Sequence, residues 1–595
     1  MQENLGIIDI QTYFPRYYIS QYDLEEYDRV PHGKYTIGLG QTNMSFVDDN
    51  EDINSMCLTV LDKLIKKNNI SLNQISRIEV GTEAIIDKSK SVKIHLMELF
   101  KATYNNDIEG VTVLNACYGG ISALLNSFNW LFSKYYDNKY AIVICGDVAS
   151  YGKGPARPTG GCGTIGILLG KGGSLILENI RASYMKNAYD FYKPNPSSEY
   201  PTVDGHFSLD CYLEALYNCL NTYNNKKGII NYNEDYFCFH CPYSKLVEKA
   251  FYQLKCFEIY YKYINNISEI YQYIKNIQKE IIDEIIEKDG KFWKISKGTQ
   301  DKIKKIFYND FKAHIEPGLF LCKQLGNLYT GSIFGFLLSL LLNLSAKKQS
   351  LIGSRIFLFS YGSGLASTLL VLDIDNERYR KIIKNNQDIF SHLNERIKVQ
   401  PYLYESILLK KEKLYSKNNY IPQGKIEDLF EGTFYLTKID NMWRRFYLQK
   451  PYKELNNNPI LNKGSSDTNL NIIDSKNKRK NNENGQIQDI WSGFRKKNVI
   501  ERQLQIKKLF ENVDTEKLKN GGLNLLRADN LVENCIGVIS LPIGLGLNFV
   551  INGQKYTIPM STEEPSVIAV VSHAAKIIGE NGGFFTNCDG VYMKS

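Results

Sequence analysis

The chain has 595 residues and a formal net charge of +8, with 43% hydrophobic and 23% charged residues. This length exceeds what one core ordinarily organises, so we expect at least two domains. The hydrophobic and charged fractions are typical of a globular, water-soluble protein. The positive charge is spread along the chain without a basic helix or a base-stacking motif, so we expect no nucleic-acid partner.

The N-terminal residues show no basic start followed by a long apolar stretch, and we expect no secretory signal and a cytoplasmic location. The most apolar run, residues 333–344, is about half as long as a membrane-spanning helix. It predicts a buried core helix, and we expect no membrane partner. The cysteines are scattered, which favours reduced thiols over a disulfide framework or a zinc site.

Residues 1–452 carry a mixed α/β pattern. Short apolar segments bounded by glycine or polar residues predict buried strands at residues 141–145, 165–169, 356–359 and 368–372. Helical patterns between such segments predict helices at residues 54–67 and 121–134. Two Gly-rich turns that lead into apolar strands, from Pro158 and from Ser360, suggest a duplicated α/β unit, although such turns also occur by chance.

Residues 453–490 differ in composition from the rest of the chain. They are rich in Asn, Lys and Ser and poor in aromatic residues, so they cannot bury enough apolar surface to fold. We expect a low-complexity linker here. Its KNKRK run could be a nuclear address or an RNA contact, but a solvated charge cluster is the favoured interpretation.

Globular patterning returns over residues 491–595, which predict a small α+β fragment. The pattern indicates a helix over residues 497–510 and a hairpin with Asn552-Gly553 as its turn. A second helix is predicted over residues 562–575, with acidic residues in its first turn.

Cys117 has the strongest local signal for chemistry. It follows a β-rich stretch and precedes Tyr-Gly-Gly and a helix-like run, which predicts a tight strand-to-helix turn. The partial positive charge of the helix N-terminus would lower the thiol pKa there and favour a nucleophilic thiolate. The alternative is a small buried apolar cysteine. Gly-rich turns that could bind a thioester oxygen, or be plain structural turns, occur at residues 157–163, 326–332 and 361–364.

Two further side chains could transfer protons. Glu83 has small and apolar neighbours, which raise a carboxyl pKa and suit a general base, although it could be an ordinary loop residue. His240, also among apolar neighbours, could be an acid, a base or a hydrogen-bond donor, or a core histidine. Lys245 and Lys249 would share one helix face and could meet a phosphate.

A series of motifs connects these residues, in the order EVGTEAIIDKSKSVK, NACYGG, ARPTGG, AYDFYKP, FHCPYSKLV, GNLYTGS, SYGSGLAST and NYIPQGKIEDLFEGTFYL. In sequence and order they resemble the eukaryotic-type 3-hydroxy-3-methylglutaryl-CoA (HMG-CoA) synthases, from the N-terminus to about Pro451. The resemblance implies a thiolase-like αβαβα layered fold with duplicated halves, usually in a homodimer. It also implies condensation of acetyl-CoA with acetoacetyl-CoA and water in the mevalonate pathway, without a metal, flavin or nicotinamide cofactor.

The resemblance implies a role for each matched residue. Cys117 matches the nucleophile that acetyl-CoA acetylates, Glu83 the base that deprotonates the acetyl methyl, and His240 the residue that polarises acetoacetyl-CoA. Positions near the substrates match Asp87, Asp147, Tyr151, Thr159, Asp190, Asn327 and Ser363, and a CoA-facing helix carries Lys245 and Lys249. Cys241 stands where the family often has Ser, and residues 251–310 match the family poorly.

The tail resembles the start of the class II HMG-CoA reductases in ENCIG, LNFVING, IPMSTEEPSVIA and ENGGF. Glu564 matches that family's catalytic Glu. The sequence does not include the region where those enzymes keep their catalytic Lys, Asp and His and their nicotinamide-binding domain. We therefore expect no reductase activity from this chain alone.

Two other functions compete with the synthase. A ketoacyl-synthase type of condensing enzyme typically pairs its Cys with two His or with His and Asn, whereas here Glu83 accompanies Cys117 and His240. A non-catalytic scaffold that kept the fold is the second alternative, and the intact motif residues argue against it.

Overall fold

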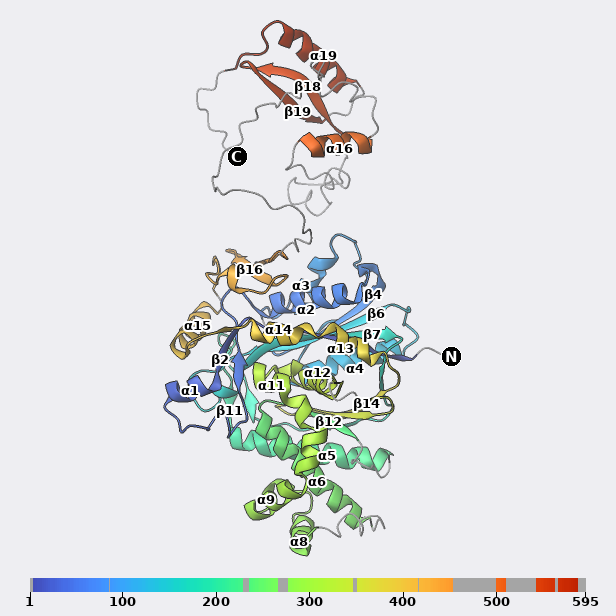
Figure 1. Ribbon diagram of the computed structural model, residues 1–595, viewed down its shortest axis with the longest axis vertical. Coiled ribbons are helices and arrows are strands. Elements are labelled where there is room, and N and C mark those ends of the chain that lie inside the picture. The colour runs from blue at the N-terminus through green and yellow to red at the C-terminus, as the bar shows by residue number, and fades with distance from the viewer. Residues whose placement is uncertain are drawn as a thin grey trace, which may run out of the picture. The chain divides into compact units, whose positions relative to one another are not determined.

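The computed structural model describes residues 4–84, 86–227, 235–265, 277–345, 350–415, 417–452, 499–509, 542–561 and 566–586. The chain divides into two compact units, Met1–Asn458 and Pro459–Ser595 (Figure 1). The predicted linker at residues 453–490 and Glu564 lie outside the described residues. The predicted division into residues 1–452, 453–490 and 491–595 therefore stays a prediction.

The first unit is built on a ten-stranded sheet with the order β12-β13-β14-β8-β1-β7-β6-β4-β5, and β9 pairs with β14 beside this path. The strands are β1 (Leu5–Tyr13), β4 (Ile75–Thr82), β5 (Thr112–Leu114), β6 (Tyr140–Ala149), β7 (Gly161–Lys171), β8 (Leu175–Leu177), β9 (Ala182–Met185), β12 (Tyr236–Phe239), β13 (Arg355–Gly362) and β14 (Ala366–Ile374). The four strands predicted from apolar runs lie inside β6, β7, β13 and β14, so those predictions are confirmed.

The two ends of this sheet repeat one pairing pattern. On one side β4 runs parallel to β6, β6 antiparallel to β7, and β7 antiparallel to β1. On the other side β12 runs parallel to β13, β13 antiparallel to β14, and β14 antiparallel to β8. The halves join where Ile7 of β1 faces Leu175 of β8. The predicted duplicated α/β architecture is confirmed.

Helices cover the outer faces of the two halves of this sheet and also lie between the two halves (Figure 1). Figure 1 shows α2 and α3 on one side and α5 and α6 on the other, with α4 and α12 between. These helices are α2 (Ile53–Asn68), α3 (Val92–Leu96), α4 (Gly119–Leu131), α5 (Gly205–Lys227), α6 (Ser244–Ile264) and α12 (Ser332–Ser345). The predicted helices at residues 54–67 and 121–134 correspond to α2 and α4. The apolar side chains of residues 333–344 in α12 are buried, as predicted for a core helix.

Smaller elements complete the first unit. Its other helices are α1 (Gln21–Asp28), α8 (Lys279–Glu287), α9 (Lys297–Ile306), α10 (Tyr308–His314), α11 (Phe320–Leu325), α13 (Tyr379–Asn385), α14 (Asp388–Asn394) and α15 (Pro401–Leu414). Its other strands are β2 (Tyr17–Ser20), β3 (Asn43–Ser45), β10 (Phe191–Tyr192), β11 (Thr202–Val203), β15 (Ile397–Lys398), β16 (Phe434–Ile439) and β17 (Arg445–Gln449). A short 3-10 helix, η6 (Tyr329–Gly331), precedes α12.

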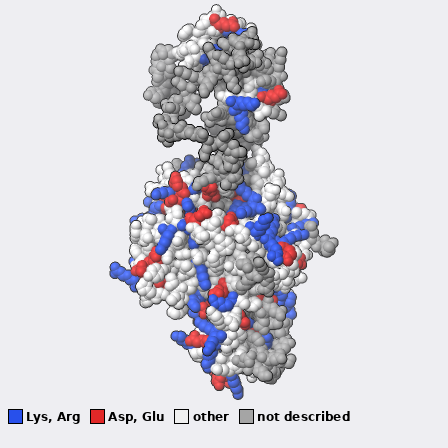
Figure 2. All heavy atoms as spheres, viewed as in Figure 1, with Lys and Arg blue, Asp and Glu red and all other residues white. Residues whose placement is uncertain are grey.

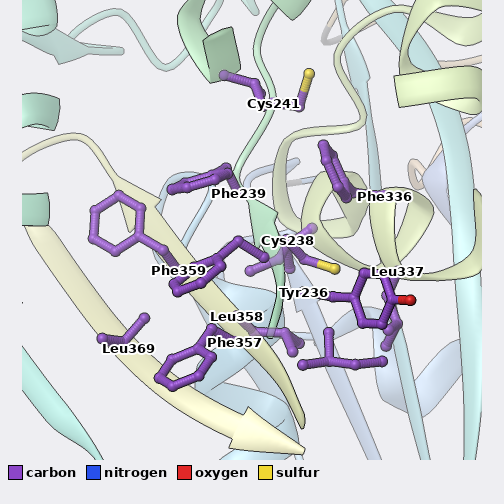
Figure 3. Packing of buried hydrophobic residues seen from close by; sticks show 14 of the residues in the cluster. Tyr236, Cys238, Phe239, Cys241, Phe336, Leu337, Phe357, Leu358, Phe359 and Leu369 are labelled. Atoms are coloured by element: carbon purple, nitrogen blue, oxygen red, sulfur yellow. The ribbon is translucent and has the colours of Figure 1, made fainter. Parts of the chain in front are cut away.

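The core beneath the β12 end is aromatic (Figure 3). The rings of Phe237 and Phe357 stack at 4.6 Å between centroids on the paired strands β12 and β13. Cys238 and Cys241 form a C-x-x-C pair around His240, and both are buried. Among the described residues, no group of three or more His, Cys, Asp or Glu side chains is placed to hold a metal ion. The packing fixes the end of β12, and thus the position of His240.

On the face drawn in Figure 2, the first unit presents both Lys and Arg side chains and Asp and Glu side chains. Within the described part of the chain, no helix combines the length and apolarity needed to cross a membrane.

The second unit contains a hairpin and two helices among its described residues. Strands β18 (Ile543–Ile551) and β19 (Gln554–Ser561) pair antiparallel. Asn552 and Gly553 at their turn have φ angles of 48° and 77°, which a type I′ turn requires, so the predicted hairpin is confirmed. Helix α16 (Val499–Leu509) matches the predicted helix over 497–510. Helix α19 (Val567–Glu580) begins later than the predicted 562–575, so the predicted acidic residues in its first turn are wrong, and it ends at Glu580, directly before Asn581-Gly582.

Candidate active site

Cys117 lies in a tight turn between β5 and α4, as the sequence predicts. Two glycines from elsewhere in the fold press against this turn. A side chain on Gly81, in β4, would come within 2.5 Å of the Gly119 backbone, and one on Gly362, at the end of β13, within 2.6 Å of the Tyr118 backbone. Only glycine fits at such distances, so each half of the fold holds one side of the Cys117 turn.

Glu83 contacts the thiol directly. It follows β4, and its Oε1 accepts a hydrogen bond from the Sγ of Cys117 at 3.3 Å. Burial raises the pKa of the Glu83 carboxyl from 4.5 to about 7, against the opposing effect of Lys193. This agrees with the sequence-based expectation of a raised carboxyl pKa. A carboxyl that titrates near neutral pH can both take and return a proton.

The charge state of Cys117 differs from the sequence-based interpretation, which favoured the thiolate. Burial raises the thiol pKa well above 9, and the carboxylate of Glu83 raises it further. These two effects outweigh the partial positive charge at the start of α4. The thiol is therefore neutral at rest, and its activation requires a neighbouring base. Glu83, already bonded to the thiol, is placed to be that base.

Asp147 is an anchor beneath the site. It is 1% exposed, at the end of β6, and its Oδ1 accepts the backbone N–H of Glu83 at 2.7 Å. Its Oδ2 accepts the backbone N–H of Thr330 at 3.2 Å and lies 2.8 Å from the Thr330 hydroxyl, which is also 2.8 Å from the Gly81 carbonyl. Protein donors surround both carboxylate oxygens of Asp147. The geometry therefore indicates that Asp147 positions Glu83 and does not contact the substrate.

An aromatic wall adjoins the Cys117 thiol. Tyr151, Tyr329 and Ala149 form a small buried cluster against which Cys117 packs. The Tyr151 and Tyr329 rings meet edge to face at 6.3 Å. Asn327 is buried, and its Oδ1 accepts the backbone N–H of Tyr329 at 2.8 Å. These contacts place two predicted residues, Tyr151 and Asn327, in or beside this wall.

Thr159 is the last residue of the short 3-10 helix Arg157–Thr159, within the Gly-rich turn at residues 157–163 that leads into β7. Its hydroxyl donates to the Ala156 carbonyl at 2.7 Å. Ala156 packs against the aromatic wall. The hydrogen bond from Thr159 to Ala156 therefore stabilises the turn next to this wall.

His240 follows the last residue of β12 and is 2% exposed. Its backbone N–H donates to the Phe359 carbonyl at 2.9 Å, and burial lowers the imidazole pKa to about 3. The ring is therefore neutral and can donate a hydrogen bond without carrying charge.

His240 is linked to the Cys117 side of the site through α12. The next residue, Cys241, donates its backbone N–H to the Ser332 hydroxyl at 3.0 Å. Ser332 directly follows η6, which carries Tyr329 and Thr330. Within the described residues, no hydrogen bond joins the imidazole to Glu83 or Cys117. The structure thus brings Glu83 and Cys117 into contact. His240 is connected to them only indirectly, through Cys241, Ser332 and the 3-10 helix η6.

Asp190 braces the second Gly-rich turn. It is fully buried; its Oδ2 accepts from the Tyr361 hydroxyl at 2.8 Å and its Oδ1 from the Gly364 backbone N–H at 2.9 Å. Ser363 lies between these two bonded residues. Asp190 therefore fixes the turn that presents Ser363, and its oxygens are occupied by protein donors.

Lys245 and Lys249 lie on α6, as predicted. Lys245 lines a groove of about 740 Å³ whose other cations are Lys304, Lys305, Lys312 and Lys323. Lys245 pairs with Glu248 at 2.5 Å. Burial, and then the charge of Lys304, lower the pKa of Lys249. A groove with this excess of cations suits a phosphate-bearing ligand.

Asp87 is separate from the thiol. Its Oδ1 accepts the backbone N–H groups of Ser89 and Lys90 at 2.8 and 2.7 Å, and these bonds lower its pKa. It lines a second cavity, of about 1180 Å³, which also reaches Glu83 and Lys193. Lys193 was not singled out in the sequence, although it lies in the AYDFYKP motif.

The repeated α/β halves and the Cys117–Glu83 pair at the strand ends define a thiolase-like condensing enzyme. Family models for the N-terminal and C-terminal parts of hydroxymethylglutaryl-coenzyme A synthase match residues 1–173 and 175–450. Hydroxymethylglutaryl-CoA synthase A of Dictyostelium discoideum is 41% identical over 75% of this chain and 90% of its own length. The cytoplasmic Homo sapiens synthase is 41% identical over 76% of this chain and 88% of its own length.

The solved structure of MvaS in complex with 3-hydroxy-3-methylglutaryl coenzyme A is similar to the first unit. It covers 76% of this chain and 100% of its own chain, with a TM-score of 0.64 and 25% sequence identity. The chain belongs to the HMG-CoA synthase family. A family model for hydroxymethylglutaryl-coenzyme A reductase also matches residues 498–594, as the tail motifs predicted.

Proposed function

We propose that this chain condenses acetyl-CoA with acetoacetyl-CoA and water to give HMG-CoA and CoA, with Cys117 as nucleophile, Glu83 as base and His240 as the group that polarises the ketone. The observation that carries these roles is the 3.3 Å contact between the Cys117 thiol and the Glu83 carboxyl, in a chain of the HMG-CoA synthase family. The steps are proton transfers, acyl transfers and one addition of a carbanion to a ketone, and none of them is an electron transfer to or from the enzyme, so the reaction as proposed requires no redox cofactor.

The first step acetylates the enzyme. Glu83 takes the thiol proton, and the Cys117 sulfur attacks the carbonyl carbon of acetyl-CoA. The thioester bond to CoA breaks, and CoA leaves as a thiol after receiving that proton. The pKa of Glu83, about 7, suits both transfers, because the carboxylate is present at neutral pH and its acid form returns the proton readily.

The second step forms the carbon–carbon bond. Glu83, again ionised, takes a proton from the methyl of the acetyl-Cys117 thioester, and the carbanion attacks the ketone carbon of acetoacetyl-CoA. The negative charge develops on the ketone oxygen, where the neutral imidazole of His240 would donate a hydrogen bond. The oxygen then takes a proton from Glu83, which restores its charge. Hydrolysis of the Cys117 thioester by water releases HMG-CoA.

The groove beside α6 is our candidate for the CoA nucleotide. Lys245 lines this groove with four other lysines, against Glu248 and Glu316. Lysine ammonium groups bind phosphate oxygens by charge-assisted hydrogen bonds. In this arrangement the predicted CoA-facing role of Lys245 requires no movement of α6, whereas Lys249 is not among the residues that line the groove.

We also propose a homodimer that forms along β5 and acts in the cytoplasm, in the mevalonate route to isoprenoids. In the described part of the chain β5 is an edge strand, and Val111 and Leu114 beside its free edge are 54% and 51% exposed. Such an edge pairs readily with a second copy. Cytoplasmic location is supported by the human relative of that name. Light scattering of the purified protein and cell fractionation test these two points.

The experiment for the reaction uses the purified full chain with acetyl-CoA and acetoacetyl-CoA. We expect release of free CoA thiol together with HMG-CoA, identified by mass spectrometry. Cys117→Ala should abolish both while the circular dichroism spectrum stays unchanged. Cys219, buried on α5, provides the matched control, Cys219→Ala. Residual synthesis by Cys117→Ala would refute the assigned nucleophile.

A further inference from the structure

Lys193 contacts the side of Glu83 that faces away from the thiol. It follows β10, and its Nζ lies 3.6 Å from Oε2 of Glu83 and 3.3 Å from Oε2 of Glu199. The ammonium also lies 5.4 Å from the centre of the Tyr329 ring, within the range of a cation–π contact. Its side chain is only 19% exposed. A lysine held at this depth has its position fixed by these three partners.

The two oxygens of Glu83 therefore have different partners. Oε1 accepts from the Cys117 thiol, and Oε2 lies against Lys193. The Glu83 backbone is fixed separately by Asp147. We propose that Lys193 is a positioning residue for Glu83: it holds Oε2, so that Oε1 stays on the reacting sulfur, and its charge favours the ionised carboxylate. This inference rests on the proposed role of Glu83 as the base.

The groups around Glu83 have opposing effects on the pKa of its carboxyl. Burial and the carboxylates of Asp147 and Glu199 raise its pKa, whereas Lys193 and the hydrogen bond from Cys117 lower it. The hydroxyls of Tyr151 and Tyr329 also face this group, and both have raised pKa values, so they stay neutral. Lys193 is thus the cation that offsets two nearby carboxylates.

The segment that carries Lys193 is itself held in place. Asn195 accepts the backbone N–H of Ser197 at 2.9 Å, and Ser198 donates to Glu412 of α15. The Tyr415 hydroxyl lies beside Glu199. Burial raises the pKa of this hydroxyl, and the Glu199 carboxylate raises it further. Contacts with the end of α15 therefore support the Lys193–Glu199 pair, and the ammonium is placed before substrate arrives.

The test compares Lys193→Met, Lys193→Arg and Glu199→Gln in the full chain, with Lys186→Met as the matched control. Lys186 pairs with Glu214 at 3.1 Å on a different part of the surface. Two profiles are measured against pH: kcat/KM for HMG-CoA formation, and the rate of Cys117 alkylation by iodoacetamide. The second needs no substrate and reports the ionisation of Glu83, because its carboxylate accepts the thiol hydrogen bond.

The acid limb of the pH profiles should shift in opposite directions in Lys193→Met and in Glu199→Gln. Removing the Lys193 charge raises the Glu83 pKa, so the acid limb of both profiles moves to higher pH in Lys193→Met. A rise of one unit from about 7 leaves roughly a tenth of the carboxyl ionised at pH 7 in place of about half, which is about a fivefold loss of kcat/KM. Lys193→Arg keeps the positive charge, so its acid limb should lie at the same pH as in the wild type. Glu199→Gln should move it to lower pH.

Two results would overturn the inference. One is an unmoved acid limb in a folded Lys193→Met protein, and the other is an equal shift in Lys186→Met. If Lys193→Met does not fold, Glu199→Gln decides, since its shift to lower pH is required by the same electrostatics. A wild-type protein that forms no HMG-CoA would refute the proposed function instead, and the alkylation profiles would still test Lys193.

Discussion

The buried carboxyl of Glu83 should cost the fold stability at neutral and alkaline pH, and Glu83→Gln should remove that cost. Its pKa is 4.5 in an unfolded chain and about 7 in the folded protein. Below pH 4.5 the group is protonated in both states and contributes nothing. Above pH 7 the folded state must carry a buried charge, and a shift of this size corresponds to about 3 kcal/mol, at about 1.36 kcal/mol per pKa unit.

The assay is urea unfolding of the full-length wild type and of Glu83→Gln from pH 5 to pH 8.5, followed by tryptophan fluorescence. Trp130, Trp293 and Trp443 all lie in the first unit. The variant should be more stable by about 2–3 kcal/mol at pH 8, and the difference should shrink towards pH 5. Asp147 also titrates, at about 6, but is present in both proteins. A difference that is independent of pH, or a variant that is less stable at pH 8, would refute the reasoning.

Three further predictions concern residues around the site. Thr330→Val should lower stability by about 2 kcal/mol in urea unfolding, because Asp147 loses its buried hydroxyl partner; an unchanged midpoint would contradict this. Asp190→Asn should reduce kcat more than it raises KM, because the Ser363 turn loses its charged acceptor, and a pure KM effect would argue against a positioning role. Lys245→Glu should raise the KM for CoA thioesters several-fold with a similar kcat, unless the nucleotide binds elsewhere.

Local patterns were sufficient to predict much of the framework. The apolar runs over 141–145 and 356–359 predicted strands correctly. Helices cover both faces of the sheet there, so the side chains on both faces of these strands are apolar and polar residues do not alternate with them. The Asn-Ala-Cys-Tyr-Gly-Gly sequence predicted the turn at Cys117, and its second glycine lies where a side chain would come within 2.2 Å of the Thr330 carbonyl oxygen. These features depend on neighbouring residues in the chain, so a sequence pattern can show them.

The electrostatics of the site could not be predicted in this way. The helix N-terminus suggested a thiolate at Cys117, but burial and Glu83 raise the thiol pKa, and both depend on the assembled fold. Asp147 and Asp190 matched positions near the substrates, yet their oxygens are occupied by donors from distant segments. Lys193 reaches Glu83 from 110 residues away in the chain, so no local motif marked the pair.

The central claim is that Cys117 carries the acetyl group and that acetoacetyl-CoA removes it. The most direct measurement is mass spectrometry of the intact protein and its peptides after brief mixing with acetyl-CoA at low temperature. We expect one acetyl group, located on the Cys117 peptide, that disappears with formation of HMG-CoA when acetoacetyl-CoA is added. An acetyl group on another residue, or an acetyl-Cys117 that acetoacetyl-CoA leaves unchanged, would contradict it.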